Sequence, residues 1–257
     1  MGKEKIDRSF QEKRATKKNI FVPYIMAGDG GLEMLEERIN FLQDSGVAAI
    51  ELGIPFSDPV ADGPTIQKAG QRALKNGTTL ASVLDTLGKF KETRTIPIIL
   101  MTYINLIYIY GVEKFAADCE KVGVDGVIIP DLPMEEESLV AEALEKHLIA
   151  FIRLAALTSP KERITELARR SEGFLYAVAV RGTTGAREAY EQDVASYLET
   201  LKAHSSVPVL AGFGVSTADQ AHELSSHSDG VIVGSTIVQL LHEGKEEEVR
   251  ILIQNSL

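Results

Sequence analysis

The stretch AAIELGIPFSDPVADGP (48–64) decides the fold class and points to the chemistry of this chain. It begins as an apolar strand and continues as a loop that three prolines stiffen. Successive strand residues point to opposite faces, so positions 50, 52 and 54 form an apolar face, and Glu51 lies on the other face between Ala49 and Gly53. The simpler alternative, a surface acid on a half-exposed strand, would need a polar face throughout. We therefore expect a buried carboxylate, which is costly to keep without a partner.

Short apolar runs of this kind recur along the chain and are typical of buried parallel strands. Amphipathic segments with helical spacing, such as 32–46, 113–123 and 135–147, lie between them. The eight predicted strands are IFVPYIMAG (20–28), AAIELGI (48–54), PIILMTY (97–103), GVIIPD (126–131), AFIRLAAL (150–157), GFLYAVAV (173–180), VPVLAGFG (207–214) and GVIVGS (230–235). Eight βα units in 257 residues match a (β/α)8 TIM barrel better than an open doubly wound sheet.

The predicted barrel has one domain, an added helix and two extended loops. No Gly-, Ser- or Pro-rich linker splits residues 1–257, and a helix over 7–14 is expected to close the bottom of the barrel. The second βα loop (55–64) precedes a helix that opens at Thr65, and the sixth (181–187) leads to a helix near Tyr190. Long βα loops line the catalytic face of a barrel. The sixth, rich in Gly and Thr, is interpreted as a lid or as an ordinary connection.

Composition excludes several classes of partner and site. The net charge of −10 argues against nucleic acid and anionic membranes, because both require a basic face. Cys119 is the single cysteine, so no internal disulfide or multi-cysteine metal site can form, and we expect it to pack on a helix face. The apolar runs are too short to span a bilayer, and no signal-peptide cleavage pattern follows the charged N-terminus. A cytoplasmic location is expected.

The ends of the last two predicted strands indicate a phosphate site. Gly212-Phe213-Gly214 and Gly234-Ser235 are each followed by a helix start. Helix N-termini favour anions, and barrels often bind phosphate between strands seven and eight. The alternative is a pair of tight turns, which also require glycine.

The absence of some residue types from the predicted strands limits the reactions that this chain could catalyse. None of the predicted strands contains Lys or His, so a Schiff-base mechanism, a histidine metal site and histidine acid–base catalysis are all disfavoured, and no metal is expected. Carboxylates must then transfer protons. The candidates are Glu51, Asp62 and Asp131, with the phenols of Tyr176 and Tyr103 as supplements.

The motif PFSDPVADGPTIQKA (55–69) resembles the signature of the tryptophan synthase alpha subunit family. Further matching motifs are FVPYIMAGD (21–29), LMTYIN (100–105), GVDGVIIPDLP (123–133), GFLYAVAVRGTTGAR (173–187), VLAGFGVST (209–217) and DGVIVGS (229–235). The resemblance implies a barrel enzyme that cleaves indole-3-glycerol phosphate to indole and glyceraldehyde 3-phosphate. It also implies that this chain has no cofactor and passes indole to a pyridoxal-phosphate-containing beta subunit in an α2β2 complex.

The same resemblance assigns roles to individual positions. Glu51 and Asp62 match the catalytic acids, and Tyr176 matches the tyrosine beside them. The matched substrate-binding positions are Tyr24, Met101, Tyr103, Ile128 and Phe213 around the indole, Gly185, Gly214, Gly234 and Ser235 at the phosphate, and Thr184 in the lid. Asp58 and Asp131 match positions that face or communicate with the beta subunit, so Asp131 becomes an interface residue rather than a catalytic one.

The implied mechanism needs no external electron sink. Once C3 of the indole is protonated, the ring itself accepts the electrons of the breaking C–C bond. Glu51 would supply that proton and take one from the glycerol hydroxyl, which requires a raised pKa. Asp62, ionised, would accept the indole N–H and stabilise the cation.

The chain departs from the family pattern at Gly30, Leu106 and Leu157, where prolines are common, and at Arg181 and Thr183 in the sixth loop. None of these changes removes a catalytic group. The alternatives to the two-enzyme complex are a free-standing lyase, a non-catalytic phosphoester-binding activator subunit, and another phosphosugar barrel such as an isomerase. Arg153, in the fifth predicted strand, is interpreted as one half of a salt bridge at a strand end, in preference to a phosphate ligand.

Overall fold

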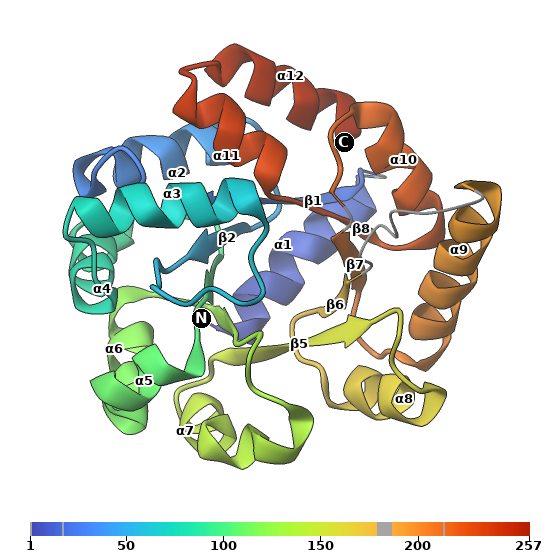
Figure 1. Ribbon diagram of the computed structural model, residues 1–257, viewed down its shortest axis with the longest axis horizontal. Coiled ribbons are helices and arrows are strands. Elements are labelled where there is room, and N and C mark those ends of the chain that lie inside the picture. The colour runs from blue at the N-terminus through green and yellow to red at the C-terminus, as the bar shows by residue number, and fades with distance from the viewer. Residues whose placement is uncertain (1, 17, 179–186, 213) are drawn as a thin grey trace.

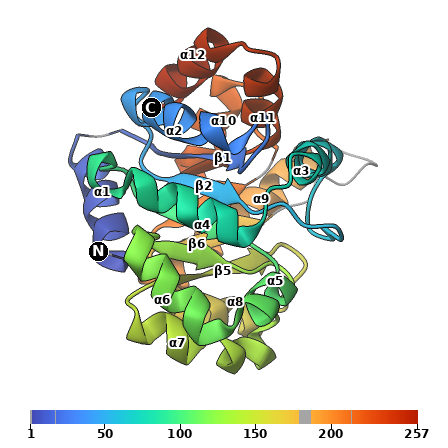
Figure 2. The ribbon, with the colours of Figure 1, turned by 90° about the vertical axis from the view of Figure 1, so that its left-hand side faces the viewer.

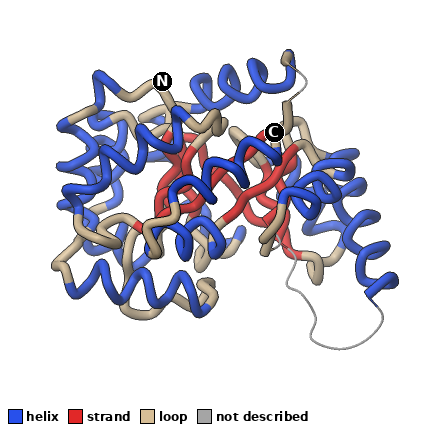
Figure 3. The backbone as a smooth tube through the Cα atoms, turned by 90° about the horizontal axis from the view of Figure 1, so that it is seen from above, coloured by secondary structure: helices blue, strands red, loops and turns tan. Residues whose placement is uncertain are grey.

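A closed parallel barrel organises the structure, which is a computed structural model that describes residues 2–16, 18–178, 187–212 and 214–257. Within these ranges eight parallel strands pair in sequence order, and β8 pairs back with β1. Figure 1 looks onto the ring of strands, and Figure 3 shows the strands enclosed by helices. The predicted (β/α)8 fold is confirmed, whereas the single domain over 1–257 stays a prediction.

Every predicted strand is present, and among the described residues each is shorter than predicted by one to three residues in total. The strands are β1 (Ile20–Met26), β2 (Ile50–Gly53), β3 (Ile98–Met101), β4 (Gly126–Ile128), β5 (Ala150–Ala156), β6 (Leu175–Val178), β7 (Val209–Gly212) and β8 (Gly230–Val233). Because β4 ends at Ile128, Asp131 lies in the loop after the strand rather than at its end. Apolar residues therefore continue into the βα loops beyond the last ladder hydrogen bonds.

Helices precede, separate and follow the strands, and most of them cover the outside of the barrel. They are α1 (Lys3–Ala15), α2 (Leu35–Asp44), α3 (Pro64–Lys75), α4 (Leu80–Lys89), α5 (Ile104–Tyr110), α6 (Val112–Val122), α7 (Ala141–Lys146), α8 (Lys161–Arg170), α9 (Arg187–His204), α10 (Ala218–His227), α11 (Ser235–His242) and α12 (Glu246–Ser256). Short 3₁₀ helices occur at η1 (Leu32–Met34), η2 (Lys91–Thr93) and η3 (Met134–Leu139). Throughout the described ranges, no helix combines the length and the apolar character that a membrane span requires.

The strands separate two apolar layers. Ile50 and Leu52 belong to a cluster with the surrounding helices, whereas Ala49 belongs to a cluster inside the barrel with residues such as Ile128 and Phe174. The alternation predicted for β2 is therefore confirmed. The barrel interior is a packed core, and the site must lie above it.

Helix α1 closes the bottom of the barrel, as predicted, and extends four residues further toward the N-terminus than expected. Ile6 and Phe10 enter the interior cluster. Ser9 Oγ donates to the carbonyl of Ala48 at 2.5 Å, and Lys13 Nζ donates to that of Gly46 at 2.7 Å. Figure 2 shows α1 at the end of the barrel opposite the arrowheads of the strands. The carboxyl ends of the strands are thus the open end.

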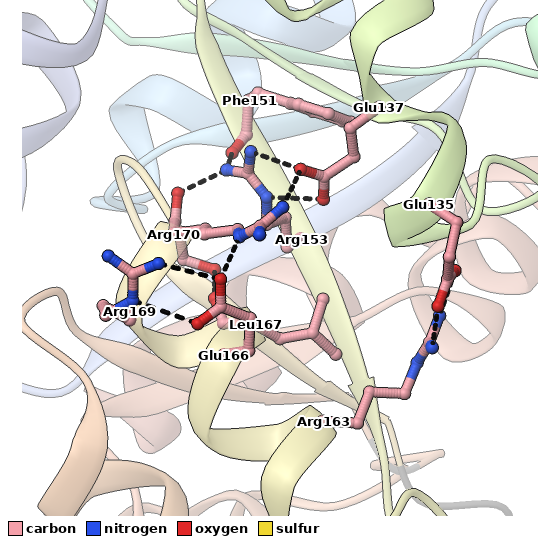
Figure 4. Close-up of polar contacts among 10 residues, drawn as sticks. Glu135, Glu137, Phe151, Arg153, Arg163, Glu166, Leu167, Arg169 and Arg170 are labelled. Atoms are coloured by element: carbon pink, nitrogen blue, oxygen red, sulfur yellow. Dashed lines mark hydrogen bonds and ion pairs between the residues drawn. The ribbon is translucent and has the colours of Figure 1, made fainter.

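The prediction of one helix over 135–147 is wrong, because the segment divides into η3 and α7. Glu137 turns inward, is 7% exposed, and pairs with Arg153 through two hydrogen bonds of 2.7 and 2.9 Å (Figure 4). Arg153 is thus one half of a salt bridge, but it lies in the middle of β5 rather than at a strand end. The amphipathic spacing of 135–147 fits an α-helix throughout. It does not show that residues 134–139 adopt the tighter 3₁₀ conformation in which the Glu137 carboxylate points inward.

Cys119 lies on the buried face of α6, as expected. Burial raises the pKa of its thiol, which keeps it protonated and unreactive. The five histidines lie in helices or directly after them, as predicted: His204 in α9, His222 and His227 in α10, His242 in α11, and His147 after α7.

Candidate active site

Glu51 lies in the second strand with its side chain inside the barrel. In the sheet it is paired with Tyr24 of β1 and Ile99 of β3. The residue is 2% exposed, and its Oε2 atom has no hydrogen-bond partner among the residues that the structure describes. The buried acid inferred from the alternation of β2 is therefore present at the top of the packed interior.

The surroundings of Glu51 favour its neutral form. Burial, and then the negative charge of Asp62, raises the pKa of Glu51 to about 8. The phenols of Tyr24 and Tyr176 share this environment, since burial and the two carboxylates raise their pKa values as well. At neutral pH, Glu51 is consequently a proton donor held among neutral hydroxyl groups.

The second βα loop carries Asp62 and is held against Tyr103. Phe56 stacks on the Tyr103 ring with 5.1 Å between ring centroids, and the N–H of Ala61 donates to the Tyr103 hydroxyl at 3.2 Å. Burial raises the pKa of Asp62 to about 6, while a hydrogen bond with the Tyr103 phenol acts to lower it. Asp62 is thus mostly ionised at neutral pH. Tyr103, which the sequence assigned to the indole pocket, is 2% exposed and supports this loop.

Two strand glycines make room for the tyrosines of the site. A Cβ atom on Gly53 would lie 1.9 Å from the Tyr24 hydroxyl oxygen, and one on Gly212 would lie 2.4 Å from a ring carbon of Tyr176. Both phenols therefore rest on bare backbone. Sequence reasoning did not assign Gly53 a role, although a glycine on the barrel-facing side of a strand is a signal of close approach.

The remaining apolar positions assigned to the indole pocket differ in depth. Met101 is partly buried and contacts both the interior cluster and the cluster formed by Tyr24, Met26 and Ile66. Ile128 is fully buried within the interior cluster. Met101 is thus at the boundary of the site, whereas Ile128 forms part of the packing beneath it.

The ends of β7 and β8 lie together at the same rim. The Thr236 hydroxyl at the start of α11 donates to the carbonyl of Val215 at 2.9 Å, which ties the two loops. Gly214 and Ser235 are exposed, and Gly234 lies against Tyr24. Helix α11 begins at Ser235 and α10 at Ala218, as the sequence predicted. Phe213, Thr184 and Gly185, also assigned to the substrate, lie outside the described residues.

Comparison with known proteins identifies the family. Residues 10–256 match the family model described as tryptophan synthase alpha chain. A tryptophan synthase alpha chain of Oceanobacillus iheyensis is 60% identical over 257 residues, which covers 100% of this chain and 98% of the relative. The chain belongs to the tryptophan synthase alpha chain family. The resemblance noted in the sequence is thereby confirmed.

Other members of the alpha chain family agree. The alpha chain of Bacillus thuringiensis subsp. konkukian is 48% identical over 254 residues, covering 99% of this chain and 97% of the relative. The crystal structure of the alpha subunit from Legionella pneumophila superposes with a TM-score of 0.89 at 33% identity, covering 100% and 97% of the two chains. A ligand-free tryptophan synthase structure from M. tuberculosis has a TM-score of 0.87 at 32% identity, covering 98% and 96%.

The two positions that the alpha chain family resemblance assigned to the partner interface lie near exposed apolar side chains. Asp58 is exposed in the second loop, where it accepts a hydrogen bond from the Ser57 hydroxyl at 2.5 Å. Asp131 accepts the N–H of Ile104 at 3.0 Å and so caps the start of α5. Large apolar side chains are exposed in the second loop, Val60 by 83%, and in α5, the helix that Asp131 caps, Tyr108 by 73% and Ile109 by 75%.

Proposed function

We propose that this chain cleaves indole-3-glycerol phosphate to indole and glyceraldehyde 3-phosphate, with Glu51 and Asp62 as its catalytic residues. The reaction is the lyase reaction of the alpha chain family, and the chain matches that family along nearly its whole length. The observation that carries the residue assignment is the pair itself. A buried carboxyl with a pKa of about 8 lies close enough to a second carboxyl, with a pKa of about 6, for the two charges to interact. One acid and one carboxylate are then available together at neutral pH.

Glu51 performs both proton transfers in this proposal. Its neutral carboxyl gives a proton to C3 of the indole, which makes the ring an indoleninium cation. The resulting carboxylate takes the proton of the hydroxyl on the adjacent glycerol carbon. As that C–O bond becomes a carbonyl, the C–C bond breaks and its electron pair returns to the ring. The products are indole and the aldehyde, and Glu51 is protonated again.

Asp62 stabilises the cation between these two steps. As a carboxylate it accepts the indole N–H, whose acidity rises when C3 is protonated. A single preorganised group of this kind is typically worth about 3 kcal/mol of barrier. The Tyr103 contacts that hold the second loop support this role, because they fix the carboxylate before the substrate binds. Tyr176, with Tyr24 nearby, is proposed to complete the site around the ring.

The phosphate is proposed to bind at the rim of β7 and β8. Gly214, Gly234 and Ser235 lie there, and the bond from Thr236 to Val215 holds the two loops together. The start of α11 supplies unsatisfied N–H groups that favour an anion. Thr184, Gly185 and Phe213 are proposed to contribute as well, by family resemblance.

A beta subunit that contains pyridoxal phosphate is the proposed partner, in a cytoplasmic α2β2 complex that receives the indole. The exposed apolar side chains of the second loop and of α5, beside Asp58 and Asp131, support a docking surface at the open end of the barrel. The solved relatives from M. tuberculosis include an aminoacrylate-bound form of tryptophan synthase. A free-standing lyase with the same site is the competing hypothesis.

An assay of indole release from indole-3-glycerol phosphate, with and without an added beta subunit, tests both statements. We expect release by the chain alone, faster release in the complex, and co-elution of the two chains. Release that Glu51→Gln leaves intact would contradict the catalytic assignment. An unchanged rate without co-elution would favour the free-standing lyase.

A further inference from the structure

The loop after β1 is bound to the far end of α3. Asp29 is 3% exposed, and its carboxylate accepts two hydrogen bonds from the Arg72 guanidinium, at 2.6 Å from Nε and 2.7 Å from Nη2. Asn76 Nδ2 donates to the carbonyl of Gly28 at 3.1 Å. Arg38 of α2 donates to the backbone carbonyl of Asp29. A bidentate arginine–carboxylate pair fixes both distance and orientation.

Glycine turns shape this loop, in which Gly31 N–H donates to the carbonyl of Gly28 at 3.0 Å. Gly28, Gly30 and Gly31 all adopt positive φ angles, of 78°, 89° and 106°. Three glycines give the unfolded loop more conformational freedom than other residues would, so folding must fix more of it. The loop is therefore held by its own turn hydrogen bonds and by the side chains that bind it, of which Arg72 makes the paired contact.

Helix α3 needs an anchor because its buried face interlocks weakly. That face consists of Ile66, Ala69, Gly70 and Ala73 and packs on a cluster with Tyr24 and Met26. Helices resist sliding when large side chains of one fit between those of the other. Three of these four positions carry at most one side-chain carbon, so they permit close approach but offer little resistance to movement along the helix axis.

The opposite end of α3 carries Asp62. Gln67 donates from its backbone N–H to the carbonyl of Gly63 at 2.9 Å and from Nε2 to the carbonyl of Asp62 at 2.8 Å. Asp62 is thus bound to the first turn of the helix as well as to Tyr103. Since a helix is stiff along its axis, a shift allowed at Arg72 pulls on Asp62 against the Tyr103 contacts that hold the second loop.

We propose that Asp29 and Arg72 are positioning residues for cleavage: their ion pair sets the place of α3 along its axis and so the place of Asp62 relative to Glu51. The proposal rests on the proposed function, in which Asp62 stabilises the indoleninium cation. A displacement of about 1 Å in a reacting group can lower a rate by about 10². The pair acts on the transition state through Asp62 and does not touch the substrate.

The test compares Arg72→Met, Arg72→Lys and the double variant Asp29→Asn/Arg72→Met with the parent protein in the indole-release assay. We expect kcat to fall at least tenfold in Arg72→Met and in the double variant, with KM changed less than threefold. Arg72→Lys keeps the charge but loses the second hydrogen bond, so its kcat should be intermediate. The double variant removes both charges and thereby avoids an unpaired buried carboxylate, which protects against misfolding.

Arg163→Met provides the matched control. Arg163 of α8 forms a bidentate pair with the exposed Glu135, at 2.5 and 3.0 Å (Figure 4), and α8 and α3 lie on different sides of the barrel (Figure 1). Its loss should leave kcat within twofold of the parent value. If kcat fell merely because an arginine–carboxylate pair had been removed, it would fall in Arg163→Met as well as in Arg72→Met.

A titration of Asp62 by carboxyl NMR separates this proposal from the proposed function, because it needs no turnover. If α3 shifts, the burial of Asp62 and its hydrogen bond with Tyr103 both change, and its pKa departs from about 6. An unchanged Asp62 titration in the double variant, or a kcat within twofold of the parent with only a lower Tm, would overturn the proposal. An inactive parent protein would instead refute the proposed function.

Discussion

Replacing Glu51 by glutamine should abolish cleavage and at the same time stabilise the protein at alkaline pH. The pKa of the Glu51 carboxyl is raised from an ordinary 4.5 to about 8 in the folded chain. A raised carboxyl pKa means that the folded state holds its proton more tightly than the unfolded state. Stability from this group is therefore complete below pH 4.5 and is lost as the pH rises through 8. The full loss is about 5 kcal/mol as an upper value.

Glutamine has nearly the same shape and no charge, so the variant keeps the packing without this loss. Urea unfolding of both proteins at pH 5 and pH 9 measures the effect, and other titrating groups cancel in the comparison. The unfolding free energy of the variant, relative to that of the wild type, should rise by about 3 to 5 kcal/mol from pH 5 to pH 9. Equal pH dependence in the two proteins would refute a buried acid of high pKa. Substantial residual cleavage by Glu51→Gln would refute its role as the proton donor.

Three further predictions follow from the site and its supports. Asp62→Asn should lower cleavage by about 10² and remove the rise of kcat with pH through about 6, measured as a pH–rate profile. Gly53→Ala should place a methyl group against the Tyr24 hydroxyl and reduce cleavage while far-UV circular dichroism stays unchanged; full activity would contradict the close packing. Arg153→Met should cost about 3 kcal/mol of unfolding free energy, because it removes both short hydrogen bonds of the buried Glu137 and leaves only the 3.6 Å ion pair with Arg170; a loss below about 1 kcal/mol would show that the Arg153 pair contributes no more than an exposed one.

The fold could be read from the sequence because its determinants are local. Each strand is a short apolar run, and a carboxylate between two small residues on β2 has one low-energy place, inside the barrel top. The alternation alone puts Glu51 there. Helix starts after β7 and β8 were equally clear, because glycine and hydroxyl residues mark them.

Long-range pairings could not be read in this way. Arg153 and Glu137 are 16 residues apart, and nothing in either local pattern shows that the glutamate turns inward and shortens the helix. The phenol of Tyr24 above Gly53 depends on the register between β1 and β2. Such contacts are set by how strands align in the closed barrel, which periodicity along one segment does not encode.

Helix α1 and the filled interior limit the directions from which a molecule can reach Glu51. With α1 below and a filled interior above it, the carboxyl ends of the strands are the open side of the barrel in the part of the chain that the structure describes. If substrate, indole and aldehyde all pass through this open end, substrate entry and product release depend on each other. A partner that covers the second loop and α5 would therefore control the order of substrate entry and product release.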